Sequence, residues 1–199
     1  MILKLLFLTT LFAPVMSALA ESLDSASRQR KRLPASAFSI QYAGSTGFLT
    51  GGYFIGTASE KLFGGIQYGY TPVSMGGPIH TISLKFMVDP FSIMLRETVS
   101  IRPVQAGVFF TQSFGSNLPF SWDHRYPASY YWWLPSQRWH VFVSSALMFS
   151  NMGHGFIKRS SIYLESNTND LYIYSYASNT ATLSLWDIVF FGVGVRLYY

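Results

Sequence analysis

The closing stretch "VFFGVGVRLYY" (residues 189–199) alternates apolar residues with small or charged ones in steps of two. The apolar positions are Val189, Phe191, Val193, Val195, Leu197 and Tyr199, and most slots between them hold Gly192, Gly194 and Arg196. Successive side chains of a β-strand point to opposite faces, so this period predicts a strand with one apolar and one polar face.

The same alternation recurs in seven earlier stretches, and no window shows a convincing apolar stripe of helical period. The stretches are 37–44, 46–56, 61–71, 79–88, 104–113, 139–150 and 160–166. Eight strands fit the smallest common membrane barrel, whose interior is filled by side chains. The sequence therefore predicts an all-β fold, a closed antiparallel up-and-down transmembrane β-barrel of about eight strands. Ten strands stay possible, because residues 91–101 could hold additional strand.

The distribution of polar residues distinguishes a membrane barrel from a soluble sandwich. Only 12% of the residues are charged and 18% are aromatic. The polar faces carry glycine, serine, glutamine and a few charges, whereas a soluble sandwich would place its lysines and glutamates outside and its apolar residues inside. We therefore expect the apolar face to meet lipid, with aromatic residues near strand ends forming interfacial girdles.

The N-terminal residues predict export. Lys4, an apolar run and the small residues "SALA" before Glu21 match a secretory signal peptide over 1–20, cleaved after Ala20. We expect residues 21–35 to form a basic periplasmic tail with the cluster "RQRKR" (28–32), and residues 36–199 to form an outer-membrane barrel domain. Without Lys4 and the charges of this tail, nine positive and seven negative residues remain, so the rest of the chain is nearly neutral and nucleic acid is not an expected partner. The absence of cysteine excludes disulfides and thiolate metal sites.

Loop lengths predict an orientation. With both chain ends in the periplasm, the connections after strands one, three, five and seven face outward, where barrels keep their longer loops. The longest connection, residues 116–138, falls on that side. So does the stretch 167–180, expected to continue a strand above the membrane; the periplasmic link 89–102 fits this scheme least well.

The signal segment, the eight alternating stretches and the final aromatic residue together resemble bacterial outer-membrane β-barrel proteins. This resemblance implies localisation in the bacterial outer membrane, with its lipids and lipopolysaccharide as partners. It also implies recognition of "FGVGVRLYY" (191–199) by the barrel-assembly machinery. The oligomeric state is left open.

The stretch "FSNMGHGFIKR" (149–159) is similar to the active-site segment of the lipid A 3-O-deacylases, barrels with a serine, histidine and glutamate triad. The resemblance carries the serine to Ser150, but Met148 stands at the histidine position, and a thioether cannot accept the serine proton. His140 or His154 would have to substitute, with Glu165 as the third member. A lipid A acyl hydrolase is therefore the alternative function, and we lean toward no enzymatic activity.

Three charged residues have inward parity, namely Lys85, Glu165 and Arg196. Isolated buried charges are costly, so we expect them to pair, with a direct contact between Glu165 and Arg196. We expect this network to fill the core of a small barrel and not to conduct ions. A narrow pore for small solutes is the second alternative function.

The connection after the fifth strand is the strongest binding candidate, because it combines aromatic rings with arginines suited to sugars or lipopolysaccharide headgroups. Its members are Trp122, Arg125, Tyr130, Tyr131, Trp132, Trp133 and Arg138. The four histidines show no metal-ligand spacing, and no cofactor motif is present, so neither a metal nor a cofactor is expected. The leading expectation is a structural, adhesive or envelope-interaction role.

Overall fold

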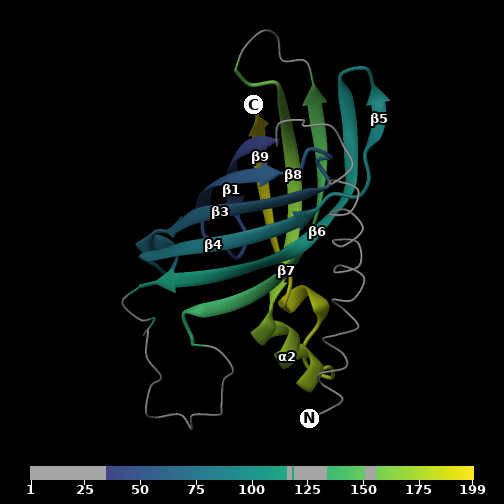
Figure 1. Cartoon of the computed structure of the whole chain (residues 1–199). Helices are drawn as coiled ribbons and strands as arrows, with labels where there is room; N and C mark the ends of the chain where they lie inside the picture. Colours follow the sequence, from purple (N-terminus) through teal and green to yellow (C-terminus); the bar gives the residue numbers. More distant parts are fainter. Residues whose placement is uncertain (1–34, 116–117, 119–133, 151–155) are drawn as a thin grey trace.

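The computed structural model describes residues 35–115, 118, 134–150 and 156–199. They form one antiparallel sheet in the order β4-β3-β2-β1-β9-β8-β7-β6-β5, and β4 also pairs with β6. That last pairing closes eight strands into an up-and-down barrel and leaves β5 outside the ring (Figure 1). The closed all-β barrel predicted from the alternation is confirmed.

The ring is built from strands of 8 to 16 residues. They are β1 (Ser36–Ala43), β2 (Leu49–Gly56), β3 (Leu62–Thr71), β4 (Ile79–Val88), β6 (Val99–Phe114), β7 (Gln137–Ser150), β8 (Arg159–Asn169) and β9 (Phe190–Tyr198). The first and last strands pair directly, with Ala37 opposite Tyr198 and Ala43 opposite Gly192. The closing stretch of the sequence therefore seals the ring.

The antiparallel order gives the barrel two different ends. The end that carries Ala35 and Tyr199, together with the β2–β3, β4–β6 and β7–β8 connections, is called the terminal end below. The end that carries the β1–β2, β3–β4, β6–β7 and β8–β9 connections is called the loop end. Figure 1 shows the C-terminus and β5 near the top and α2 at the opposite, loop end.

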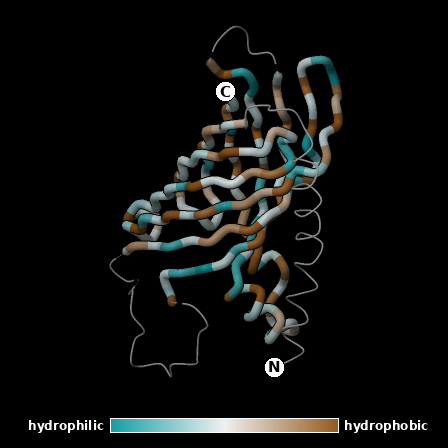
Figure 2. The backbone as a smooth tube through the Cα atoms, in the orientation of Figure 1, coloured by the Kyte–Doolittle hydropathy of each residue, from teal (hydrophilic) through white to brown (hydrophobic). Residues whose placement is uncertain are grey.

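Apolar and polar residues alternate along the strands (Figure 2). On the outer face, Leu84 and Leu164 are 50% and 57% exposed. Their inward neighbours Lys85 and Glu165 are 1% and 0% exposed. The two faces of each strand thus fall as the period of two predicts.

The glycines of the closing stretch make room inside the barrel. A β-carbon at Gly194 would lie 2.5 Å from the side chain of Tyr163, closer than packed atoms approach. Tyr163 is a large, fully buried side chain opposite Gly194 on β8. Glycine at this inward position therefore lets the Tyr163 ring lie across the lumen.

An additional strand does occur within residues 91–101, as the sequence allowed. It is β5 (Ile93–Arg96), which pairs with the first residues of β6 beyond the ring. β6 also shifts register against β7 between Arg102 and Gln105, at a bulge containing Pro103 and Val104. The barrel therefore has eight wall strands and one extra strand, and not ten in its wall.

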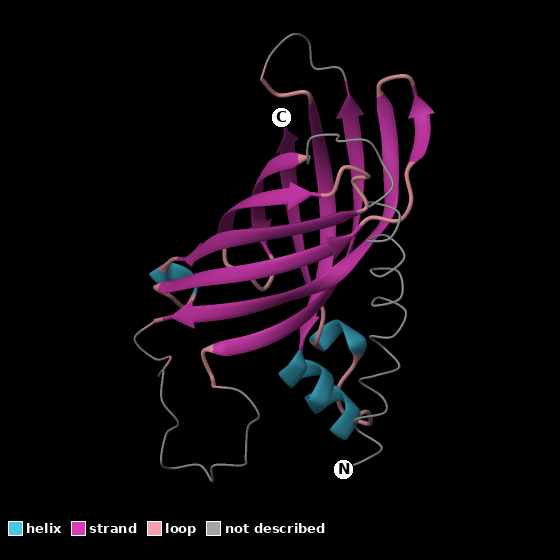
Figure 3. Ribbon diagram, in the orientation of Figure 1, coloured by secondary structure: helices cyan, strands magenta, loops and turns pink. Residues whose placement is uncertain are grey.

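The connection between β8 and β9 corrects a second expectation. The sequence predicted that 167–180 continues a strand; β8 does extend to Asn169, but residues Asp170–Ser178 form the helix α2 at the loop end (Figure 3). The Asn169 side chain accepts a hydrogen bond from the backbone N–H of Tyr172 at 2.9 Å, so it caps the helix and ends the strand. Two 3₁₀ turns, η1 (Val73–Met75) and η2 (Leu185–Asp187), lie in loop-end connections. No helix within the described ranges is long and apolar enough to cross a membrane.

Candidate functional site

An ion pair crosses the middle of the lumen. The Lys85 ammonium on β4 donates to both carboxylate oxygens of Glu165 on β8, at 2.7 and 2.5 Å. Strands β6 and β7 stand between β4 and β8 in the ring, so the pair bridges the interior and does not join neighbours. The ammonium also lies 4.1 Å from the ring centre of Phe142 and 5.0 Å from that of Phe109, which adds cation–π attraction.

Arg196 makes a separate bridge, which corrects the predicted Glu165–Arg196 contact. Its guanidinium donates to the side-chain oxygen of Gln105 at 2.8 Å and lies 3.9 Å from the ring centre of Tyr163. Ser144 donates to the same Gln105 oxygen at 3.2 Å. The three predicted interior charges are thus all buried, but Glu165 takes Lys85 as its partner and Arg196 takes an amide and an aromatic face.

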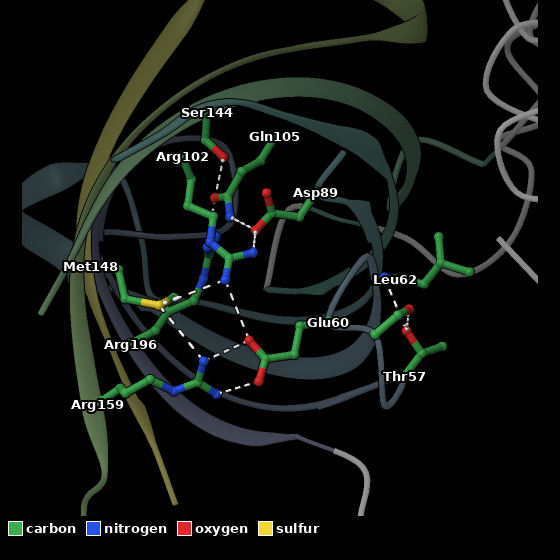
Figure 4. A network of polar contacts seen from close by, with 11 residues as sticks. Thr57, Glu60, Leu62, Asp89, Arg102, Gln105, Ser144, Met148, Arg159 and Arg196 are labelled. Carbon is green, nitrogen blue, oxygen red and sulfur yellow. Dashed lines mark hydrogen bonds and ion pairs between the residues drawn. The ribbon is translucent and has the colours of Figure 1, made fainter. Parts of the chain in front are cut away.

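A second set of charges closes the terminal end (Figure 4). Arg102 binds Asp89 at 2.7 Å and Glu60 at 3.3 Å. Arg159 binds both Glu60 oxygens, at 2.6 and 2.5 Å. Gln105 donates to Asp89 at 2.7 Å and so joins this set, called the terminal network below, to Arg196.

The terminal network was not predicted from the sequence. Glu60 lies in the β2–β3 turn and Asp89 lies just after β4, where alternation assigns no face. Arg102 is separated from Gln105 by the bulge, yet both point inward. The signal that could have found Arg102 was the proline at 103, because proline inside a strand marks a bulge or an edge.

The two acids of the terminal network have opposite pKa shifts. Burial alone would raise the pKa of Glu60, but the hydrogen bonds and positive charges of Arg159 and Arg102 outweigh burial and hold this pKa below its usual value. For Asp89 burial dominates, so its pKa is raised despite Arg102 and Gln105. Glu60 is therefore the acid whose ionised form the fold favours.

Toward the loop end the lumen is lined mainly by uncharged polar side chains. Thr81 and Ser113 hydroxyls lie 3.3 Å apart, and the Thr111 hydroxyl lies 3.2 Å from Nε2 of His140. The His140 ring stacks on Phe109 with ring centres 4.3 Å apart. Above Thr81 and Ser113 a cavity of about 380 Å³ opens at the mouth of the barrel.

The candidate triad is not assembled by the described residues. Ser150 ends β7 at the terminal end, opposite Arg159, whereas Glu165 lies opposite Ser144. Six residues of extended strand separate these positions, about 20 Å. His140 lies still farther along β7, at the loop end, and His154 is outside the described residues.

Met148, at the position of the motif histidine, is buried in the terminal half of the lumen. Its sulfur accepts from Arg102 at 3.7 Å and lies 4.0 Å from a nitrogen of Arg159. Met148 therefore packs against the terminal network. This packing gives the residue at the motif position a structural role.

Most of the candidate binding loop lies outside the described residues. This applies to Trp122, Arg125, Tyr130, Tyr131, Trp132 and Trp133, which remain a prediction. Arg138 is described, and its guanidinium donates to the backbone oxygens of Leu134 at 2.9 Å and Gln137 at 2.7 Å. In the described parts of the chain, no three histidine, aspartate or glutamate side chains gather as a metal site would require.

Comparisons of the chain with protein-family models, with curated proteins and with solved structures found no match. The similarity to lipid A deacylases therefore has no support beyond the short stretch around Ser150, and the fold and the lumen carry the functional argument.

Proposed function

We propose that this protein is an integral outer-membrane β-barrel with a filled lumen and an envelope-interaction role, structural or adhesive, exercised from its loop end. One observation carries the proposal: apolar side chains such as Leu84, Leu164 and Val193 cover the outer face while Lys85, Glu165 and Arg196 are buried inside. A water-soluble barrel would reverse this arrangement, because contiguous exposed apolar surface is rare on soluble monomers. Lipid hydrocarbon around the barrel accounts for the apolar outer face.

Aromatic clusters near the two ends of the outer face support the same placement. At the loop end, the Tyr68 hydroxyl lies 2.6 Å from Nδ1 of the exposed His80. At the terminal end, Tyr199 stacks on Phe156 at 4.7 Å and lies 6.4 Å from Tyr53. Amphipathic rings concentrate at the two boundaries of a membrane, so the pair of clusters is what two interfaces require.

The proposal includes export and orientation. The signal peptide (1–20) and nearly all of the basic tail (21–35) lie outside the described residues, and we propose cleavage after Ala20. The terminal end then faces the periplasm, and the loop end, with α2 and the long β6–β7 connection, faces outward. Lipids and lipopolysaccharide are the proposed surroundings, and the closing strand is the proposed signal for the assembly machinery.

The lumen favours a filled barrel over a pore. Lys85–Glu165 and Arg196–Gln105 both cross the interior, and Arg102 and Arg159 meet over Glu60 at the terminal end. Charged groups that bind each other across a small lumen occupy the path an ion would need. We therefore expect no stable conductance steps from the purified protein in planar bilayers.

The membrane proposal is tested by fractionation and gel migration. Cells that express the full chain are separated into soluble, inner-membrane and outer-membrane fractions, and the outer-membrane extract is run on a gel with and without boiling. We expect recovery in the outer membrane and a shift in migration on boiling, as a closed barrel unfolds. Recovery in the soluble fraction with unchanged migration would reject the proposal.

A further inference from the structure

The cavity at the loop end is lined by both hydroxyl groups and apolar side chains. Three strands (β3, β4 and β6) and two connections (β1–β2 and β6–β7) contribute hydroxyl groups to its lining, those of Ser45, Thr71, Thr81, Ser113 and Ser136. Its apolar lining includes Phe48, Ile79 and Leu118. Its volume of about 380 Å³ falls at the lower end of the range for small-ligand pockets, about 300–1,000 Å³.

Buried polar atoms at this cavity have no partner among the described residues. Ser136 is 1% exposed and lines the cavity, and its hydroxyl makes no hydrogen bond within the described chain. Asn167 lies beside the cavity-lining Gly44; its amide nitrogen also has no partner among the described residues, and its side-chain oxygen accepts from Ser45. Buried polar groups in folded proteins nearly always have a partner, so this end of the lumen is built for a polar guest.

The layer below the cavity repeats the pattern. Ser83 follows Thr81 on the inward face of β4, and Gln67 lies opposite Ser83 on β3. The Ser83 hydroxyl and both polar atoms of the Gln67 side chain are buried without a partner in the described part of the chain. At the terminal end carboxylates and arginines bind one another, although Asp89 Oδ1 and Arg102 Nε are also buried without a partner in the described chain.

From these observations we infer that the loop-end cavity is a binding site for an uncharged sugar. A sugar ring offers hydroxyl groups that both donate and accept, together with a C–H face that packs on apolar or aromatic side chains such as Phe48. The inference rests on the proposed function only for the side of the membrane on which the cavity opens. Binding to the purified protein therefore tests the site separately from the membrane placement.

The charge near the cavity argues against a cationic ligand. Arg138 is the charged residue that lines it among the described positions, and its guanidinium already donates to two backbone oxygens. Burial raises the pKa of Asp170, and the positive charge of Arg138 opposes this rise. This positive charge would repel a cation, and the preference for a neutral ligand over an anion rests on the hydroxyl and apolar lining of the cavity.

The test measures binding of methyl glycosides of glucose, galactose, mannose and N-acetylglucosamine to the detergent-folded protein by saturation-transfer difference NMR. We expect saturation transfer to at least one of the four, and a loss of affinity of about fivefold in Ser136→Ala, as one hydrogen bond implies. Absence of transfer to all four would overturn the inference. Stronger binding of glucuronate than of the methyl glycosides would also overturn it.

Ser161→Ala is the matched control. Ser161 is fully buried and its hydroxyl is also without a partner in the described chain, but it faces the lumen at the terminal half, opposite Arg196. Removal of its hydroxyl should leave sugar binding unchanged. An equal loss in Ser136→Ala and Ser161→Ala would mean that both variants act through the fold and would count against the site.

The sugar could come from solution or from a neighbouring lipopolysaccharide molecule, and competition separates these sources. Deacylated core oligosaccharide is added to the protein with the best methyl glycoside bound. If the oligosaccharide displaces the methyl glycoside at a lower concentration than the free sugar does, the result supports the site and identifies lipopolysaccharide as the source. Failure to displace, with the methyl glycoside still bound, supports the site with a free sugar as its ligand.

Discussion

Lys85 and Glu165 stand 80 residues apart in the chain and form a fully buried ion pair across the middle of the barrel. Each alone would be an uncompensated charge in a closed interior, which is costly. The pair also fixes β4 relative to β8, strands that share no ladder. The filling of the lumen therefore depends on an interaction between strands that do not touch edge to edge.

The first prediction concerns this pair. Lys85→Met or Glu165→Gln should each lower the free energy of unfolding by about 3–5 kcal/mol, because either change strands a buried charge or its hydrogen-bonding partner. The double variant Lys85→Met/Glu165→Gln should recover a large part of that loss. Urea unfolding of the detergent-folded protein measures all three, with the exposed Lys61→Met as the control. Additive losses in the double variant would contradict a coupled pair.

The second prediction is a pH dependence set by the terminal network. The pKa of Glu60 is lowered in the folded protein, so its contribution to stability is present above its unfolded pKa, about 4.3, and is lost as pH falls through the folded value. Glu60→Gln should therefore flatten the fall in unfolding free energy below about pH 4.3.

Asp89 provides the comparison of opposite sign. Its raised pKa means that protonation favours the folded state, so Asp89→Asn should make the loss of stability in acid steeper. Urea unfolding at a series of pH values measures both variants. Parallel curves for Glu60→Gln and the wild-type protein would show that Glu60 does not carry the acid sensitivity.

The third prediction addresses the outer face. Leu84→Arg places a charge where the proposed hydrocarbon lies. At a site near the midplane, this charge should lower the free energy of unfolding in lipid vesicles by about 2–4 kcal/mol. Thr182→Arg, in the exposed β8–β9 connection, should change it by less than about 0.5 kcal/mol. Equal effects from the two arginines would argue that residue 84 faces water.

The fourth prediction concerns the hydrolase alternative. Ser150 lies at the terminal end of β7, apart from Glu165 and His140, so it lacks an assembled base among the described residues. Lipid A from cells with the wild-type protein and with Ser150→Ala should give the same mass spectrum as lipid A from cells without the protein. Loss of one acyl chain with the wild-type protein alone would establish the activity.

The strands could be predicted from the sequence because a face assignment needs only the neighbouring residues. Leu84 and Lys85 differ in polarity and adjoin on one strand, so each goes to its own side. The inward placement of Glu165 and Arg196 followed in the same way. The helix α2 could not be predicted, because its sequence DLYIYSYAS has no apolar stripe and its start depends on the local cap at Asn169.

The partners inside the lumen could not be predicted for a different reason. Glu165 and Arg196 have inward parity on adjacent strands, but the register of β8 and β9 places Gly192 opposite Glu165 and Ser161 opposite Arg196. Glu165 binds Lys85 instead, because the stagger of strands around a closed ring decides which side chains meet across it. The terminal network is likewise built from a turn and a bulge, Glu60 and Arg102, where alternation carries no information.

Site-directed spin labelling in lipid vesicles tests the central claim most directly, and the chain has no native cysteine to interfere. Single cysteines replace Leu84, Leu164 and Val193 on the outer face, with Thr182 in a loop-end connection as the aqueous reference. Oxygen, which partitions into hydrocarbon, should relax the three outer-face labels more strongly than a water-soluble nickel chelate does, and the order should reverse at 182. Stronger relaxation by the nickel chelate at 84, 164 and 193 would place the outer face in water and contradict the account.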